Sequence, residues 1–319
     1  MDLTYTQYVN SKIRNKFSEY SHSVIFGQNI VSGSRISGLG AGLDQINNCI
    51  ALNTTNSENS LVGLGFGLSL SEIPSLFLMK QHDFALLGLD QLVNTYNVLR
   101  YDKLLAPFII IMIIVDSGFE GPQGSLSSLD EFASLTRAPV LLLSSKESID
   151  KAFLESSKPG LYLMALSQKN MKKICSPSEV GYIEFDEAII HEYIVYKEIG
   201  KVAIVYFGVD LSTAIEVTER LNKENYSVNL VNFTKLSRVN LETSLFAELV
   251  KNEIFIILDS GKSEIHFSSD LALKLREMSK YVYLYQRSPS QKWSEVNDDE
   301  IEFTVNCIIE RIMKGKSLG

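Results

Sequence analysis

Apolar and polar residues alternate with two different periods along the second half of the chain. Four short segments are rich in β-branched and aromatic residues, which predicts buried strands: KVAIVYFG (201–208), YSVNLVNF (226–233), EIFIILDSG (253–261) and YVYLYQR (281–287). Segments with helical spacing of apolar residues follow each of them: 211–225, 242–252, 269–280 and 299–314. Strict alternation of strands and helices implies right-handed crossovers and a mostly parallel sheet.

The first half of the chain repeats this alternation. The expected strands are 23–28, 49–53, 75–79, 108–115, 140–145 and 161–166, and the expected helices are 5–20, a segment beginning near Glu58, 83–101 and 148–157. The apolar run LLAPFIIIMIIV (104–115) is too short and too β-branched for a membrane span and is typical of a strand buried on both faces. A polar stretch, 167–199, is the expected linker, with a short hairpin or extended piece. The sequence therefore predicts an α/β protein of two domains, 1–190 and 191–319, each a mostly parallel sheet flanked by helices.

Charge and cysteine content exclude several classes of protein. The chain has 319 residues, 45% of them hydrophobic, and a net charge of −8 with no Lys/Arg-rich block. Nucleic-acid binders carry a basic surface, so we expect neither a nucleic-acid partner nor, without a spanning segment, a membrane partner. Cys49, Cys175 and Cys307 are far apart and odd in number, and no signal peptide is evident. These features favour reduced thiols and a cytoplasmic protein.

Two glycine motifs, GLGAG (38–42) and GLGFG (63–67), invite a nucleotide-loop interpretation. Neither has the G-x-G-x-x-G spacing of a dinucleotide fingerprint or the G-K-[ST] ending of a phosphate loop. Gly63 and Gly67 are four residues apart and share a helix face, so close packing against another backbone is the preferred interpretation. No C-x-x-C, H-E-x-x-H or acidic calcium loop is present, so no metal ligand is predicted. A Ser–His–Asp triad stays open, because triads assemble in space, but no G-x-S-x-G elbow supports one.

Glu58 is the acidic residue whose position carries the most chemistry. It lies in NSENSLVGLGFGLSL (56–70), between a polar stretch and an almost entirely apolar run. In one interpretation Asn56 or Ser57 caps a helix and Glu58 complements the positive helix end. In the other, Glu58 faces an apolar pocket, hydrogen-bonds a ligand nitrogen and shares a proton with it. The two are compatible, because a helix start is a rigid platform for a functional side chain.

Four blocks taken together resemble a known family. They are IFGQNIVSGSRISGLGAGL (25–43), the Glu58 block (56–70), DFALLGLDQLVNTYNVLRY (83–101) and EGPQGSLSSLDEFASL (120–135). Their order and spacing resemble the beta subunits of the decarboxylating component of 2-oxo acid dehydrogenases, such as pyruvate dehydrogenase, which are relatives of the C-terminal half of transketolase. The resemblance covers nearly the whole chain. It implies a transketolase-like pyrimidine-binding domain followed by a transketolase C-terminal-like domain.

The resemblance implies thiamine diphosphate as cofactor and a 2-oxo acid as substrate. Glu58 matches the glutamate that hydrogen-bonds the pyrimidine ring and favours the tautomer that deprotonates the thiazolium. Asn56 and Ser57 would lie beside the cofactor. Phe84 matches an aromatic of the pyrimidine pocket, although a core Phe beside Leu86 and Leu89 explains it equally well. In this family a partner alpha-type chain with a G-D-G motif holds the diphosphate and Mg²⁺; no G-D-G occurs here, which implies half of an α2β2 enzyme.

One departure from the family changes the expected reaction. The family pattern G-P-Q-H-S-Q reads Gly121-Pro122-Gln123-Gly124-Ser125-Leu126 here. The missing histidine puts transfer to a lipoyl acyltransferase in doubt. Gln123 and His82 are the substrate-side candidates, although a histidine at the nearby surface, or one that only supports site residues, is the plainer explanation of His82. Two alternatives therefore stay open: a split transketolase-like carboligase in sugar or secondary-metabolite synthesis, and a non-catalytic assembly subunit.

Overall fold

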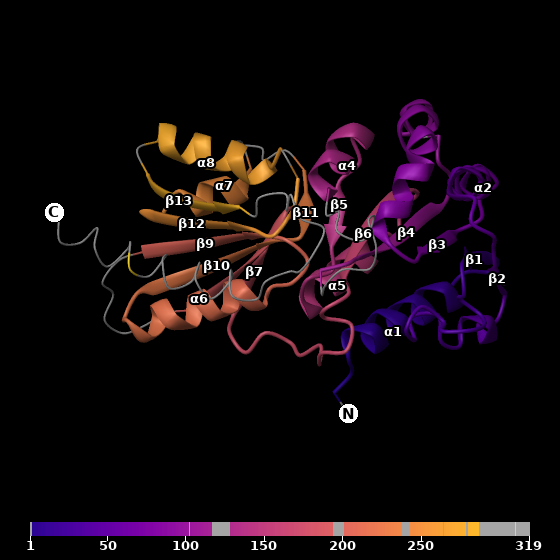
Figure 1. Cartoon of the computed structure of the whole chain (residues 1–319), viewed down its shortest axis with the longest axis horizontal. Helices are drawn as coiled ribbons and strands as arrows, with labels where there is room; N and C mark the ends of the chain where they lie inside the picture. Colours follow the sequence, from indigo (N-terminus) through magenta and orange to yellow (C-terminus); the bar gives the residue numbers. More distant parts are fainter. Residues whose placement is uncertain are drawn as a thin grey trace, which may run out of the picture. The chain divides into compact units, whose positions relative to one another are not determined.

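The chain divides into two compact units, Met1–Pro177 and Ser178–Gly319. The structure is a computed structural model that describes residues 2–101, 103–116, 128–193, 201–237, 243–263, 265–278, 280–286 and 310. Both units are built from parallel strands with helices packed on them (Figure 1). This architecture confirms the predicted α/β class with two mostly parallel sheets.

The first unit contains a parallel sheet whose strand order within the unit is β5-β6-β4-β3-β1-β2. The strands are β1 (Ser23–Gly27), β2 (Cys49–Asn53), β3 (Ser75–Met79), β4 (Pro107–Ile114), β5 (Val140–Leu142) and β6 (Gly160–Ser167). From β1 the chain passes to β2 on one side and then to β3 on the other side. The strand order therefore reverses at β1, which makes the carboxyl ends of β1 and β3 the topological switch point of this sheet.

Helices cover both faces of the first sheet. They are α1 (Tyr5–Ser18), η1 (Leu43–Gln45), α2 (Glu58–Leu70), η2 (His82–Gly88), η3 (Gln91–Thr95), α3 (Tyr96–Leu99), α4 (Leu129–Thr136) and α5 (Lys146–Glu155). One face of β4 packs through Ile109 and Ile111 on the core of α1 and α5. On its other face Phe108 contacts Phe66 of α2, with ring centroids 5.4 Å apart. Burial on both faces explains the uninterrupted apolar run of β4.

The segment 83–101 is helical, as predicted, but it does not form one regular α-helix. The segment forms a 3₁₀ helix (η2), a π-helix (η3) and one turn of α-helix (α3). Gly88 ends η2 against α2, where an added Cβ would lie 2.8 Å from Val62. Leu86, expected beside a core Phe84, is 45% exposed, and the next residue, Leu87, is 59% exposed. Close packing on α2 and a weak helix former at Gly88 override the apolar periodicity.

The second unit has the strand order β13-β12-β9-β10-β8-β7. Its strands are β7 (Tyr182–Glu184), β8 (Ala188–Tyr193), β9 (Lys201–Phe207), β10 (Ser227–Phe233), the short β11 (Lys235–Leu236), β12 (Ile254–Asp259) and β13 (Tyr281–Gln286). The hairpin β7–β8 is antiparallel, and the pairings β10–β9, β9–β12 and β12–β13 are parallel. Helices α7 (Ser244–Leu249) and α8 (Phe267–Glu277) lie on one face and α6 (Ser212–Lys223) on the other (Figure 1). The helix predicted over 299–314 falls outside the described residues, Glu310 excepted.

Candidate functional site

Glu58 is a buried carboxyl group at the first turn of α2. Its exposed fraction is 3%, although Asn59 and Ser60 beside it are exposed. The amide of Gln28 donates a hydrogen bond to Glu58 Oε1 at 3.1 Å. Among the described residues no other side chain or backbone group hydrogen-bonds this carboxyl group, so its Oε2 has room for a further partner. A buried carboxyl group with a single hydrogen bond can accept a further donor, which makes Glu58 a candidate for binding a ligand.

Gln28 was not singled out by the sequence, although it holds Glu58. It follows β1 directly, and Glu58 begins the helix that follows β2. β1 and β2 pair in parallel with Gly27 opposite Asn53. Their carboxyl ends therefore meet at one edge of the sheet, and this adjacency is the signal that could have identified Gln28. Asn53 reinforces the edge by accepting the backbone N–H groups of Ile30 and Val31 at 2.8 and 3.1 Å.

The predicted side-chain cap of α2 is wrong. Ser57 is the N-cap residue, but its side chain makes no capping hydrogen bond and instead donates to Ser60 Oγ at 3.0 Å. Its φ of −155° and ψ of 62° lie outside the extended region that is typical of N-cap residues. Asn56 and Ser57 are both exposed next to buried Glu58. Neither Asn56 nor Ser57 therefore caps the first backbone N–H groups of α2, which lie next to the buried Glu58.

The glycine prediction on α2 identifies the right motif and the wrong positions. An added Cβ at Gly63 would meet only the Gln91 side chain at 3.7 Å, and at Gly67 it would meet nothing within 4 Å. The close approach is at Gly65, where a Cβ would lie 2.0 Å from the Phe108 ring. In GLGAG the corresponding position is Gly40, where a Cβ would lie 2.3 Å from the Ile30 carbonyl oxygen. In both motifs the central glycine permits tight packing.

Phe84 lies in η2, whose last residue, Gly88, packs on the Glu58 backbone. Its side chain is half-buried, and its neighbour Leu86 is exposed. Of the two residues expected beside a core Phe, Leu86 is exposed and Leu89 is half-buried, so this alternative stays open. Phe84 sits on the element that contacts the start of α2, but its part in binding a cofactor stays a prediction.

His82 is 1% exposed and packs edge-on against Phe132 of α4, with ring centroids 4.7 Å apart. Its Nε2 lies 3.2 Å from Ser128 Oγ, and its Nδ1 has no hydrogen-bond partner in the part of the chain that the structure describes. Burial lowers the pKa of His82 to about 4. The ring is therefore neutral at physiological pH and is an acceptor or donor rather than a cation. Gln123 and Gly124 lie outside the described residues.

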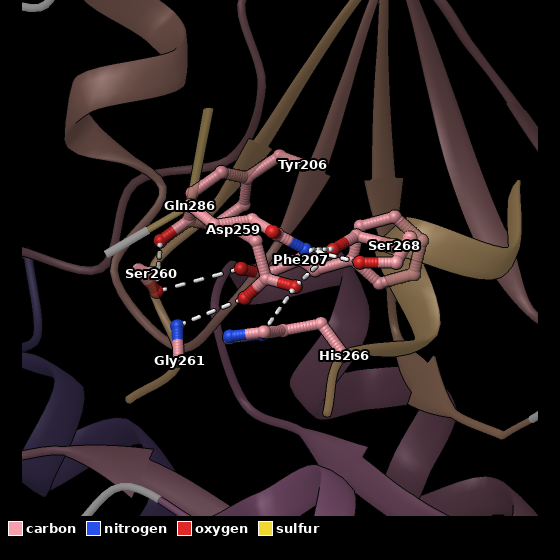
Figure 2. A network of polar contacts seen from close by, with 9 residues as sticks. Tyr206, Phe207, Asp259, Ser260, Gly261, His266, Ser268 and Gln286 are labelled. Carbon is pink, nitrogen blue, oxygen red and sulfur yellow. Dashed lines mark hydrogen bonds and ion pairs between the residues drawn. The ribbon is translucent and has the colours of Figure 1, made fainter. Parts of the chain in front are cut away.

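The second unit has a polar network at the carboxyl end of β12 (Figure 2). Asp259 Oδ2 lies 3.1 Å from His266 Nδ1 and accepts a hydrogen bond from Ser268 Oγ at 2.6 Å. Gln286 at the end of β13 donates to Ser268 Oγ at 2.9 Å. In a catalytic triad the serine hydroxyl bonds the imidazole, whereas here Ser268 donates to Asp259 Oδ2, the carboxylate oxygen that lies 3.1 Å from His266 Nδ1. These residues therefore do not form the triad that the sequence left open; they join the ends of β12 and β13 to the start of α8.

Comparison with known proteins gives a match in structure but not in sequence. No protein-family model matches the sequence, and no curated protein matches it. A solved structure of an inactive β4 tetramer of a split-gene transketolase superposes with a TM-score of 0.70 at 15% identity, covering 98% of both chains. Transketolase from Campylobacter jejuni superposes with a TM-score of 0.69 at 13% identity; the match covers 98% of this chain but 47% of that one, so the chain spans about half its length.

Among the described residues no helix is long and apolar enough to cross a membrane. Identities of 15% and 13% carry the fold and not the activity. On that evidence, the chain has the transketolase-like α/β fold, two mostly parallel sheets flanked by helices.

Proposed function

We propose that this chain is the subunit of a thiamine diphosphate-dependent enzyme that binds the aminopyrimidine ring of the cofactor through Glu58. The observation that carries the proposal is the burial of the Glu58 carboxyl group with Gln28 as its one hydrogen-bond partner among the described residues. When bound, thiamine diphosphate supplies an electron sink for cleavage of a bond next to a carbonyl group. The residues of this chain bind and orient the ring and move one proton.

Each residue has a separate task in this proposal. Gln28 fixes Oε1 of Glu58, so that Oε2 is presented to a ring nitrogen and can hold or return a proton there. Phe84 on η2 would line the ring, and Asn56 and Ser57 would border it from the exposed turn before α2. His82, neutral and buried beside Ser128, would serve the substrate side together with Gln123. The tight contact of Gly65 with Phe108 holds α2, and with it Glu58, on the sheet.

A partner chain completes the site in this proposal. The chain has no G-D-G motif, so an alpha-type subunit would hold the diphosphate and Mg²⁺ and form an α2β2 assembly. Large apolar side chains are exposed on α2 and on the following segment, 82–101, whose helices η2 and η3 contact α2: Leu64, Leu86, Leu87, Val98 and Tyr101. Exposed apolar side chains on adjoining elements suit a surface that a partner covers.

A 2-oxo acid is the first candidate substrate, as the sequence blocks around Glu58 and Asp83 suggest. The second candidate reaction is carboligation of the transketolase type. It is favoured by the match of 98% of this chain to 98% of a split-gene transketolase subunit and by Gly124 in place of the family histidine. The two are distinguished by acceptor: a 2-oxo acid with a lipoyl domain in one assay, a ketose donor with an aldose acceptor in the other.

Glu58→Gln is the variant that tests the proposal, in complex with the partner chain. The amide has the shape of the carboxyl group but cannot hold the proton, so we expect turnover to fall by about 10²–10⁴-fold with the fold unchanged. Deuterium exchange at the C2 position of bound cofactor, followed by NMR after acid quench, gives a readout that needs no known substrate, and it should slow in the same variant. Glu72→Gln is the matched control, because Glu72 is an exposed acid just beyond the other end of α2.

Wild-type turnover and exchange in Glu58→Gln would overturn this role. A complex that never binds the cofactor would favour the assembly role instead.

A further inference from the structure

A second concave site lies beside Glu58 in the first unit. It is a cavity of about 230 Å³ at the carboxyl ends of the parallel strands. Gln28 follows β1, Lys80 and Gln81 follow β3, and Gln168 follows β6, and all four line the cavity. β1 and β3 flank the topological switch point, where ligands of open parallel sheets bind. The volume is below the roughly 300–1,000 Å³ of pockets for drug-sized ligands, so it suits a small metabolite.

The lining groups select for one class of ligand. The floor includes Ile113 and Ile36, both 5% exposed, while the walls carry side-chain amides, two serine hydroxyls and the Lys80 ammonium. Among the lining residues that the structure describes, none is Asp or Glu. Lys80 is exposed and, among the described residues, has no acidic partner. A wall with one cation, several N–H and O–H donors and no carboxylate favours an anion that also has hydroxyl groups.

The serines come from a backbone segment held in an unfavourable conformation. Arg35, Ile36 and Ser37 have φ values of 47°, 48° and 53°. The left-handed region is rare for a β-branched residue such as Ile36, and such residues persist only where the surrounding structure holds them. The turn is held by the Gly40 N–H, which donates to the Arg35 carbonyl at 2.9 Å, and by contact of Gly40 with Ile30. It places Ser34 and Ser37 on the cavity wall.

From these features we infer that the cavity is a binding site for a small hydroxylated anion of the carboxylate or phosphate class. Lys80 provides the charge, and the second N–H of the Gln28 amide with the hydroxyls of Ser34 and Ser37 provides the hydrogen bonds. The site belongs to this chain alone and requires neither the cofactor nor a partner. It therefore does not depend on the proposed function, although Gln28 is common to the cavity and to Glu58.

Isothermal titration of the full chain, without thiamine diphosphate, tests the site. The probes are inorganic phosphate, glycerol 2-phosphate, glycerate and, as the uncharged control, glycerol. Lys80→Gln removes the charge from the cavity wall and should weaken binding of the anions about tenfold. Lys158→Gln removes an exposed lysine that does not line the cavity and has no side-chain partner among the described residues, and it should bind as the wild type does. Ser34→Ala/Ser37→Ala, both on exposed positions, should weaken glycerol 2-phosphate more than inorganic phosphate.

Each outcome decides the inference. Binding of the organic anions that is weakened by Lys80→Gln and not by Lys158→Gln supports it and identifies the ligand as a metabolite. Equal binding of inorganic phosphate with the same Lys80 dependence supports the anion site and makes free phosphate the ligand. Absence of binding, equal affinity for glycerol, or no effect of Lys80→Gln overturns it. None of these results affects the Glu58 proposal, which is read from cofactor exchange and turnover.

Discussion

Replacing Gly65 with alanine should destabilise the first unit, although alanine is the better helix former. Gly65 lies in the middle of α2, and an added Cβ would be 2.0, 2.2 and 2.5 Å from three ring atoms of Phe108. Phe108 is fully buried in β4 and stacks on Phe26 at 6.5 Å while meeting Phe66 edge-on at 5.4 Å. With rings on two sides, Phe108 cannot move away without displacing the core.

The expected size of the effect is the difference of two terms. Overpacking of a well-packed core costs about 1–3 kcal/mol. Replacement of glycine by alanine inside a helix returns about 1 kcal/mol. The net loss is therefore up to about 2 kcal/mol, which in a unit of this size lowers Tm by up to about 8 °C. The clash loosens the contact of α2 with the sheet, so the amide hydrogens of α2 should also exchange faster in Gly65→Ala. The first turn of this helix carries Glu58.

Gly67→Ala is the control in the same helix. A Cβ at Gly67 meets nothing within 4 Å, so only the propensity term applies and stability should rise by about 1 kcal/mol. Thermal unfolding by far-UV circular dichroism, with hydrogen exchange of the α2 peptide by mass spectrometry, measures both variants. Phe108→Leu should relieve the clash, so the double variant Gly65→Ala/Phe108→Leu should show a favourable coupling. A Gly65→Ala protein as stable as Gly67→Ala would refute the packing argument.

Two buried titratable groups make stability rise with pH in two separate pH windows. His82 has its pKa lowered to about 4 by burial, below the 6.5 of the unfolded chain, so the unfolded state binds more protons and stability falls as pH drops from 6.5 to 4. Between pH 6.5 and 4 the free energy of unfolding, measured with urea, should fall by about 3 kcal/mol more in the wild type than in His82→Gln. An equal fall in both proteins would contradict the burial of a neutral ring. Lys16, whose ammonium donates to the Phe153 carbonyl at 2.9 Å and Ser157 Oγ at 2.7 Å, has its pKa lowered to about 8 from 10.5 by burial. Its charged form is disfavoured in the fold, so stability should rise between pH 8 and 10.5, by on the order of 2 kcal/mol, and Lys16→Met should abolish the rise; an unchanged slope in that variant would count against the assignment.

The strands were predictable because each is a local apolar run. The strand expected over 108–115 is β4 at Pro107–Ile114, and its burial on both faces follows from uninterrupted apolar residues. The sequence predicts a helix over 83–101, but it could not predict the break into 3₁₀, π and α turns, because that break depends on the tertiary contact of Gly88 with α2. The strand expected over 140–145 ends at Leu142, since Ser145 and Ser148 form a capping box that begins α5. Here a recognisable cap signal, not a contact, marks the boundary.

In the candidate site, too, some residues could be identified from the sequence and others could not. Glu58 could be found because an acid next to an apolar run is a local anomaly. Gln28, Lys80 and Gln168 could not, because each is an ordinary polar residue in the sequence and they are 52 to 140 residues apart along the chain. Only the parallel sheet brings them together, by placing the carboxyl ends of β1, β3 and β6 at one edge. Knowledge of strand order, not of motifs, is what identifies them.

Gln28 contacts Glu58 and also lines the cavity, and the hydrogen-bonding groups of its side chain allow both contacts. A primary amide has two N–H groups and one acceptor oxygen, so a bond to Glu58 Oε1 uses one donor and leaves one donor and the oxygen for the cavity. A carboxylate at this position would repel Glu58 and any anion in the cavity, and an aliphatic residue would leave Oε1 of a buried acid without its hydrogen bond. An amide is therefore the side chain that fits a buried acid on one side and an anion on the other. This explains why both sites can share one residue at the switch point of the sheet.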